Sequence, residues 1–163
     1  MATILAIAAH SEDIITGAGG ALAKYASEGK QVQSIIFAAG EHPKNKIKKS
    51  VRADKLIGGS TVTHFALRPG HLEEDFKKKK VRQKLLALLE REQPEKIFTH
   101  GFELEGEHRA VNRIVLSLIN EAKLECEVYS FAVSPFTIRR RNLPKLIIDT
   151  TKTFPTKVKA ALV

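Results

Sequence analysis

The chain has 163 residues, of which 43% are apolar and 28% are charged, and this length and composition suit one globular domain spanning residues 1–163. Its single cysteine, Cys126, excludes an intramolecular disulfide and a thiolate-rich zinc site, so a metal would have to be held by histidine and carboxylate side chains. The formal net charge of +9 favours anionic partners, such as a phosphorylated substrate, or else a lysine-rich solubilising surface.

The first residues, Met1–Ala9, form a short apolar run that lacks the basic segment of a signal peptide. Elsewhere the apolar runs are also far shorter than the ~20 residues that span a bilayer. A single cysteine is compatible with a reducing compartment. We therefore expect a cytoplasmic protein without a membrane span.

Strand and helix patterns alternate along the chain. The continuous apolar run Ile4–Ala8 predicts a strand buried on both faces, and the polar loop after it leads into a helix that Gly29 ends. A long amphipathic pattern predicts one helix over residues 75–92, which Pro94 ends. In chain order we predict strand 4–8, helix 21–28, strand 32–38, helix 47–56, strand 61–67, helix 75–92, strand 96–100, helix 107–124, strand 127–133, strand 146–149 and helix 157–163.

Strands that alternate with helices of this length predict a parallel sheet built from right-handed βαβ units. The fold class that we predict is α/β, a Rossmann-like, doubly wound, three-layer sandwich with a mostly parallel sheet. In such folds, ligands bind outside the carboxyl ends of the strands, where the strand order reverses. The loops that follow the strands are therefore the candidates for a functional site.

Two of these loops place histidine beside carboxylates. Residues 10–13 read His-Ser-Glu-Asp, and residues 103–108 read Glu-Leu-Glu-Gly-Glu-His. Catalytic zinc uses three such protein ligands and keeps one position for water, whose proton a spare carboxylate can accept. Because the fold would bring both loops to one sheet edge, the sequence predicts a metal site there. The alternative is that the acidic side chains only favour the positive ends of helices and are solvated.

Three blocks of sequence carry a resemblance. Residues 7–23 hold His-Ser-Glu-Asp followed by Gly-Ala-Gly-Gly, residues 97–111 hold Thr-His followed by Glu-His-Arg, and residues 143–160 begin Leu-Pro-Lys-Leu-Ile-Ile-Asp. In order and spacing, these blocks resemble the LmbE/PIG-L family of N-acetylglucosamine deacetylases. The resemblance runs from Ile4 to Ala161, nearly the whole chain.

The resemblance implies a zinc-dependent hydrolase that removes the N-acetyl group of a glucosamine-type sugar. Its zinc ligands would be His10, Asp13 and His108, and another divalent metal is an alternative. Glu12 takes the place of the family's catalytic aspartate and would be the general base. In the reaction of the family, metal-bound water attacks the amide carbonyl and acetate leaves.

The same resemblance suggests roles for two further residues, and the position of His100 suggests a third role. Arg52 would contact the sugar or an anionic appendage, such as a phosphate or a linked nucleotide. Glu105 stands where many members have a histidine, and it would orient a ligand or bind a sugar hydroxyl. His100, at the end of a strand, would support a metal ligand through a hydrogen bond. Members of the family often form homo-oligomers, and the sequence leaves this point open.

Departures from the family pattern keep two other hypotheses open. Glu12 is one methylene longer than aspartate, and an ionised Glu105 cannot donate a hydrogen bond to an oxyanion. The chain could therefore be a catalytically impaired, ligand-binding relative of the same fold. It could also be a basic nucleotide- or nucleic-acid-binding domain, but two Tyr and no Trp argue against stacking on single strands.

Overall fold

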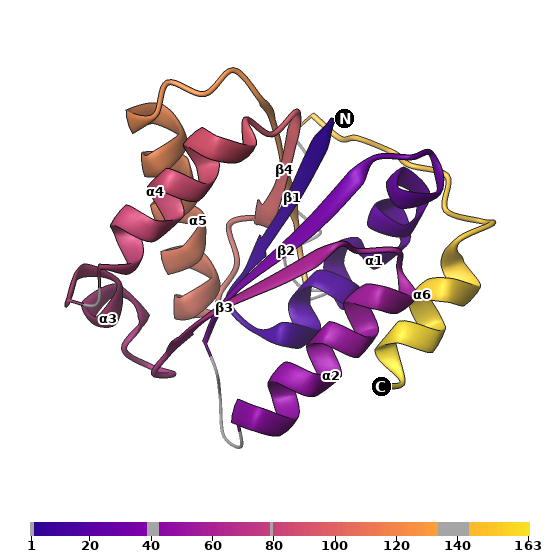
Figure 1. Ribbon diagram of the computed structural model, residues 1–163, viewed down its shortest axis with the longest axis horizontal. Coiled ribbons are helices and arrows are strands. Elements are labelled where there is room, and N and C mark those ends of the chain that lie inside the picture. The colour runs from indigo at the N-terminus through magenta and orange to yellow at the C-terminus, as the bar shows by residue number, and fades with distance from the viewer. Residues whose placement is uncertain (1, 39–42, 79, 134–143) are drawn as a thin grey trace.

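The computed structural model describes residues 2–38, 43–78, 80–133 and 144–163. Strands and helices alternate along these residues (Figure 1). The strands are β1 (Thr3–Ala8), β2 (Gln31–Ala38), β3 (Thr61–Leu67), β4 (Lys96–His100) and β5 (Glu127–Phe131). The helices are α1 (Ser11–Ser27), α2 (Pro43–Leu56), α3 (Leu72–Lys78), α4 (Val81–Glu92), α5 (Gly106–Glu121) and α6 (Phe154–Ala161).

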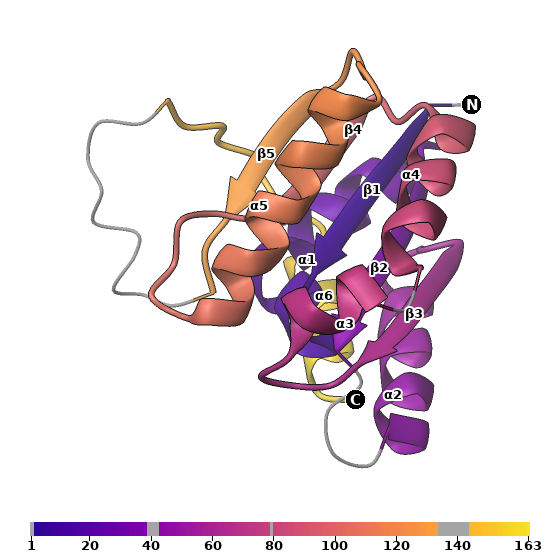
Figure 2. The ribbon, with the colours of Figure 1, turned by 90° about the vertical axis from the view of Figure 1, so that its left-hand side faces the viewer.

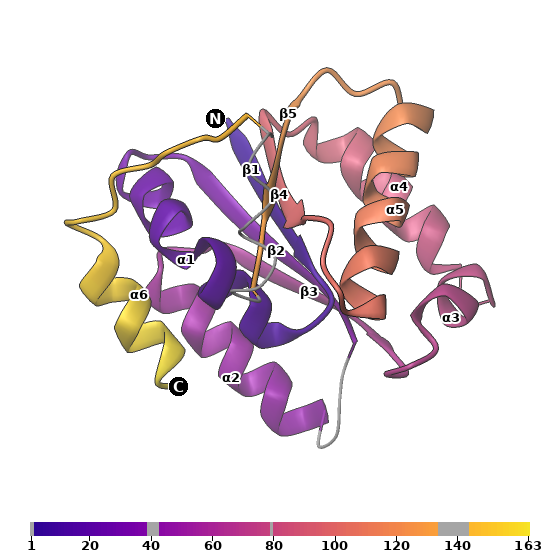
Figure 3. The ribbon, with the colours of Figure 1, turned by 180° about the vertical axis from the view of Figure 1, so that it is seen from behind.

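The strands form one all-parallel sheet in the order β3-β2-β1-β4-β5. Helices α3, α4 and α5 cover one face of the sheet, and α1, α2 and α6 cover the other (Figure 2). Seen from behind, α6 lies beside α1 and α2 (Figure 3). The predicted Rossmann-like, three-layer α/β fold is confirmed. None of the helices in the described residues is both long and apolar enough to cross a membrane.

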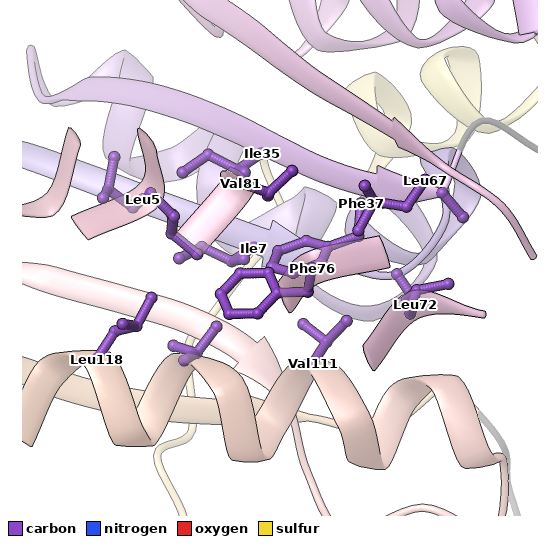
Figure 4. Packing of buried hydrophobic residues seen from close by; sticks show 14 of the residues in the cluster. Leu5, Ile7, Ile35, Phe37, Leu67, Leu72, Phe76, Val81, Val111 and Leu118 are labelled. Carbon is purple, nitrogen blue, oxygen red and sulfur yellow. The ribbon is translucent and has the colours of Figure 1, made fainter. Parts of the chain in front are cut away.

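Two hydrophobic cores, one on each face, hold the layers together. Successive side chains of a strand point to opposite faces, so Leu5 and Ile7 of β1 pack toward α3–α5 while Ile4 and Ala6 pack toward α1, α2 and α6. Every residue of β1 is buried, as expected of a central parallel strand covered on both faces. Figure 4 shows the first core, whose labelled side chains are Leu5, Ile7, Ile35, Phe37, Leu67, Leu72, Phe76, Val81, Val111 and Leu118.

The prediction of one helix over residues 75–92 is wrong. Two helices, α3 and α4, occupy this region, and Lys80 lies between them with a φ of 54°, in the left-handed region that ends a helical run. The change of direction lets Phe76 of α3 and Val81 of α4 both enter the same core. Periodicity alone could not detect the break, because the apolar residues on either side keep a helical spacing.

The predicted strand at 146–149 is also absent. Residues 144–150 have no strand partner in the part of the chain that the structure describes. Ile147 is 89% exposed, whereas Ile148 packs against the core beside α1. A short apolar run becomes a strand only where a sheet edge accepts it, and here the segment lies against helix α1, with Thr150 next to Gly20.

Helix α1 begins at Ser11, ten residues earlier than predicted. The residues after β1 that we interpreted as a polar loop form the first turns of α1, and the glycines of the Gly-Ala-Gly-Gly sequence lie inside this helix. A Cβ atom on Gly17 would lie 2.3 Å from Cδ2 of Phe131, so this glycine permits the close approach of α1 to β5. The glycines therefore serve packing and do not mark a helix start.

The strand order reverses between β1 and β4. The chain runs outward from β1 through β2 to β3, and then returns to place β4 on the other side of β1. A crevice at the carboxyl ends of two such strands is where doubly wound folds bind ligands. The two histidine-bearing loops follow these two strands.

Candidate metal centre

The carboxyl ends of β1 and β4 bring the two loops together. His10 follows β1 and precedes α1, and Asp13 lies in the first turn of that helix. The backbone N–H of His10 donates a hydrogen bond to Asp13 Oδ2 at 2.8 Å, which fixes the carboxylate beside the imidazole. His100 ends β4, and His108 lies in the first turn of α5.

The three predicted metal ligands lie close together. Asp13 Oδ2 is 3.2 Å from His10 Nδ1 and 3.3 Å from His108 Nε2. Ligand atoms about 2.0–2.1 Å from a tetrahedral zinc are ~3.4 Å apart, close to both distances. One ligand atom of each residue lies within 4.8 Å of the others. The Asp13 and His108 side chains are buried, and His10 is 21% exposed, so solvent can reach the cluster from the side of His10.

His108 shows that the cluster suits a cation. Both of its ring nitrogens are buried, and neither makes a well-aligned hydrogen bond within the described residues. Carboxylate oxygens of Asp13, Glu103 and Glu105 nevertheless lie 3.0–3.3 Å from these nitrogens. A buried polar atom without a hydrogen bond lowers stability. A divalent metal between Nε2 and Asp13 would satisfy the nitrogen lone pair and the negative charge together, so the residues fit such an ion.

His100 supports the cluster from behind. Its Nε2 accepts a hydrogen bond from the backbone N–H of Ala9 at 3.0 Å, which leaves the ring proton on Nδ1. That nitrogen faces Glu103 Oε1 at 3.1 Å and donates to it. The His100 ring stacks on the His108 ring, with centroids 3.8 Å apart and planes 13° from parallel. With both nitrogens engaged, His100 is placed to hold His108 and not to bind a metal itself.

The carboxylates change the acidity of the imidazoles. The contact with Asp13 raises the pKa of His10 to about 9, while burial opposes this effect and Glu107 adds to it. Burial would raise the pKa of Asp13, but contacts with neighbouring imidazoles, that of His10 foremost, hold it well below its usual range. Burial would lower the pKa of His108, and the contact with Asp13 outweighs burial and raises it. A metal ion must therefore displace a proton at neutral pH.

Two carboxylates that the sequence reasoning left without a role also belong to the cluster. Glu103 is 1% exposed and lies between His100 and His108. Glu107 Oε2 lies 2.7 Å from Nε2 of His10. The available signal was the run of three glutamates within five residues before His108, since each of them reaches an imidazole in the folded chain.

The other predicted site residues are placed differently. Glu105 lies at the rim, 49% exposed, with Oε2 3.0 Å from His108 Nε2. Glu12 is exposed and accepts a hydrogen bond from Ser11 Oγ at 2.8 Å, so in this conformation its carboxylate is outside the imidazole cluster. Arg52 is exposed on α2 and does not line the pocket that contains Glu12. The fold thus brings together five predicted residues, namely His10, Asp13, His100, Glu105 and His108.

A groove of about 560 Å³ opens beside the cluster, between the loop after β3 and the start of α5. Glu105 and Glu107 belong to its wall, together with Gly70, Glu73 and Arg113. Its volume lies in the range of small-molecule sites. A second cavity of about 600 Å³, between α1, β5 and the 144–157 segment, contains none of the imidazoles.

The chain is similar to a known family of proteins over most of its length. The family model described as PIG-L, GlcNAc-PI de-N-acetylase, matches residues 5–119. No curated protein sequence matches the chain. The matched segment includes all of the imidazole cluster, from His10 to His108.

Several solved structures share the fold. The N,N'-diacetylchitobiose deacetylase of Pyrococcus horikoshii is 18% identical, with a TM-score of 0.75 over 98% of this chain and 68% of that one. The 4-carboxy-2-hydroxymuconate hydratase of Pseudomonas putida is 20% identical, with a TM-score of 0.80 over 98% and 77%. A teicoplanin deacetylase, solved in a zinc-inhibited form, is 12% identical, with a TM-score of 0.78 over 98% and 82%. At these identities the likeness establishes the fold alone.

Proposed function

The chain belongs to the PIG-L family of de-N-acetylases, and from that premise we propose that it is a metal-dependent hydrolase that removes an N-acetyl group from an amino-sugar substrate. The observation that carries this proposal is the cluster of His10, Asp13 and His108 at the strand-order reversal, with ligand spacing that suits one ion. The unsatisfied nitrogens of the buried His108 support the same conclusion.

Zinc is the metal that we propose, held by Nδ1 of His10, Oδ2 of Asp13 and Nε2 of His108. When bound, zinc supplies Lewis acidity, which lowers the pKa of water to about 7 and polarises a carbonyl oxygen. Because one relative was solved in a zinc-inhibited form, another divalent ion is the alternative to test at the same ligands.

Glu12 is our candidate for the general base, which would accept the proton of the attacking water. Its carboxylate would have to leave Ser11 Oγ and turn toward the cluster, a change open to an exposed side chain in the first turn of α1. Glu105 is placed at the rim, where it could bind a sugar hydroxyl. If Glu105 were the base instead, its position 3.0 Å from His108 Nε2 would require no rearrangement.

The substrate that we propose is an N-acetylglucosamine-type sugar. The family name and the chitobiose and teicoplanin deacetylases support an N-acetylated sugar compound. Arg52 lies on the basic helix α2, which also carries Lys44, Lys48 and Lys55, and this helix is the candidate contact for a phosphate or linked nucleotide on the sugar.

The test combines metal content with turnover. Protein purified without chelator should hold about one zinc per chain, and a His10→Ala/His108→Ala double variant should hold none. A screen of N-acetyl sugars should then release acetate with the wild type only. Glu12→Gln and Glu105→Gln make the same chemical change at two positions, so the variant that abolishes turnover while keeping zinc identifies the base. Zinc binding without turnover on any N-acetyl sugar would favour a catalytically impaired relative, and no zinc uptake would refute the hydrolase proposal.

A further inference from the structure

We propose that Glu107 is a positioning residue that holds the His10 ring with Nδ1 turned toward the metal. Glu107 Oε2 lies 2.7 Å from His10 Nε2, the nitrogen on the far side of the ring from Asp13. This inference rests on the metal site proposed above. A carboxylate behind a ligating imidazole fixes the ring orientation and the tautomer that leaves the other nitrogen free to bind.

The tautomer follows from the acceptors around the ring. An ionised carboxylate only accepts hydrogen bonds, so the contact with Glu107 requires a proton on His10 Nε2. When a metal takes the place of the proton on Nδ1, the proton on Nε2 stays, and Nδ1, which lies 3.2 Å from Asp13 Oδ2, presents its lone pair to the metal. Glu107 therefore selects the neutral form of His10 that can act as a ligand through Nδ1.

Glu107 is itself held in place. Its second oxygen, Oε1, accepts a hydrogen bond from the backbone N–H of Gly70 at 2.5 Å, and its side chain is 19% exposed. Gly70 has a φ of 78°, a left-handed conformation that glycine adopts without strain. The carboxylate thus joins the loop after β3 to the metal ligand.

The loop that carries Gly70 is fixed at its other side. The buried carboxylate of Asp75 accepts hydrogen bonds from the backbone N–H of Arg68 at 3.0 Å and from its guanidinium at 2.6 Å. A chain of contacts therefore runs from α3 through the loop and Glu107 to His10. Such a rigid support is what a ligand needs to keep its position within a fraction of an ångström.

The substitution Glu107→Gln tests this role because both carboxylate oxygens are used as acceptors. Glutamine offers one acceptor oxygen and one donor NH₂, so it can satisfy Gly70 N–H or His10 Nε2–H but not both. If the NH₂ faces the imidazole, it favours the tautomer with the proton on Nδ1, which blocks the metal position. Glu107→Asp keeps two acceptor oxygens on a shorter side chain, so its zinc affinity should lie between those of the wild type and Glu107→Gln.

The matched control is Glu73→Gln, which removes the same charge from the wall of the same groove without touching an imidazole of the cluster. Zinc affinity is measured at pH 7.5 by competition with a chromophoric chelator, and thermal unfolding is followed on zinc-free protein. We expect E107Q to bind zinc 10- to 100-fold more weakly. E73Q should stay within about twofold of the wild type, and both variants should still unfold cooperatively without zinc, which shows that the weaker binding by E107Q is not a loss of the fold.

A long-range ¹H–¹⁵N spectrum of the zinc-bound protein adds a readout that a merely structural role would not change. In the wild type, the spectrum should show His10 as a single tautomer with its proton on Nε2. In E107Q, this single tautomer should be lost. Affinity of E107Q within about threefold of the wild type, or an equal loss in E73Q, would overturn the inference while leaving the metal site intact. No zinc binding by the wild type would instead refute the proposed function.

Discussion

Zinc uptake by this protein should depend steeply on pH. Before zinc binds, the pKa of His10 is about 9, so the cluster carries a proton on this ring throughout the range from pH 6.5 to 8.0. An incoming zinc ion must displace this proton, so the apparent association constant should rise about tenfold per pH unit. Across 1.5 units the expected rise is about 30-fold. His108, whose pKa is also raised, adds proton release at the acid end of the range.

Calorimetric titration in two buffers of different ionisation enthalpy measures the protons released per zinc. We expect at least one at pH 7.5, and a control variant, His71→Ala, should leave the count unchanged because His71 is exposed and contacts Glu74 outside the cluster. A count near zero, or an affinity that changes less than threefold between pH 6.5 and 8.0, would refute the reasoning, since it would mean that His10 is not protonated or is not a ligand.

Three further predictions concern the fold. Burial raises the pKa of Asp54 to about 6, so the ionised carboxylate destabilises the folded state above that pH. This destabilisation disappears as the pH falls toward 3.8. Asp54→Asn should therefore raise the free energy of unfolding by up to about 3 kcal/mol at pH 7.5, with the gain vanishing near pH 4 in denaturant titrations. Gly17→Ala should lower the free energy of unfolding by about 1–3 kcal/mol, because the new methyl group meets Phe131. An unchanged free energy of unfolding would contradict the close packing of α1 against β5. On α5, Leu118→Ala should cost about 2–5 kcal/mol, and the half-exposed Leu116→Ala no more than about 0.5, in the same assay.

Much of the fold could be predicted because its strands are continuous apolar runs. The predicted strand Ile4–Ala8 matches β1 almost residue for residue, since a strand buried on both faces leaves no polar interruption to misread. The predictions are wrong where tertiary contacts, and not the local sequence pattern, determine the secondary structure. Lys80 lies in a left-handed conformation directly before α4, within a helical sequence pattern, and the segment around Ile147 has strand composition but no sheet edge to join.

The candidate site was predictable to the level of the loops but not of the hydrogen bonds. The positions of His10, Asp13 and His108 follow from the sheet topology, which the alternating pattern predicts. The contact of Glu107 with His10 depends on the entry angle of α5 and on the loop that carries Gly70, and neither can be read from residue spacing. The orientation of Glu12 is likewise set by a rotamer and not by its position in the motif.

The reversal of strand order between β1 and β4 also bears on how the chain folds. Two ligands come from the first strand–helix unit and one from the fourth, so the site exists only after these distant segments have paired. Pairings of such high sequence separation form late and slowly. A metal bound across them would stabilise the folded state and leave the folding rate nearly unchanged, so its whole effect would fall on the rate of unfolding. The bound ion would thus determine the lifetime of the native sheet.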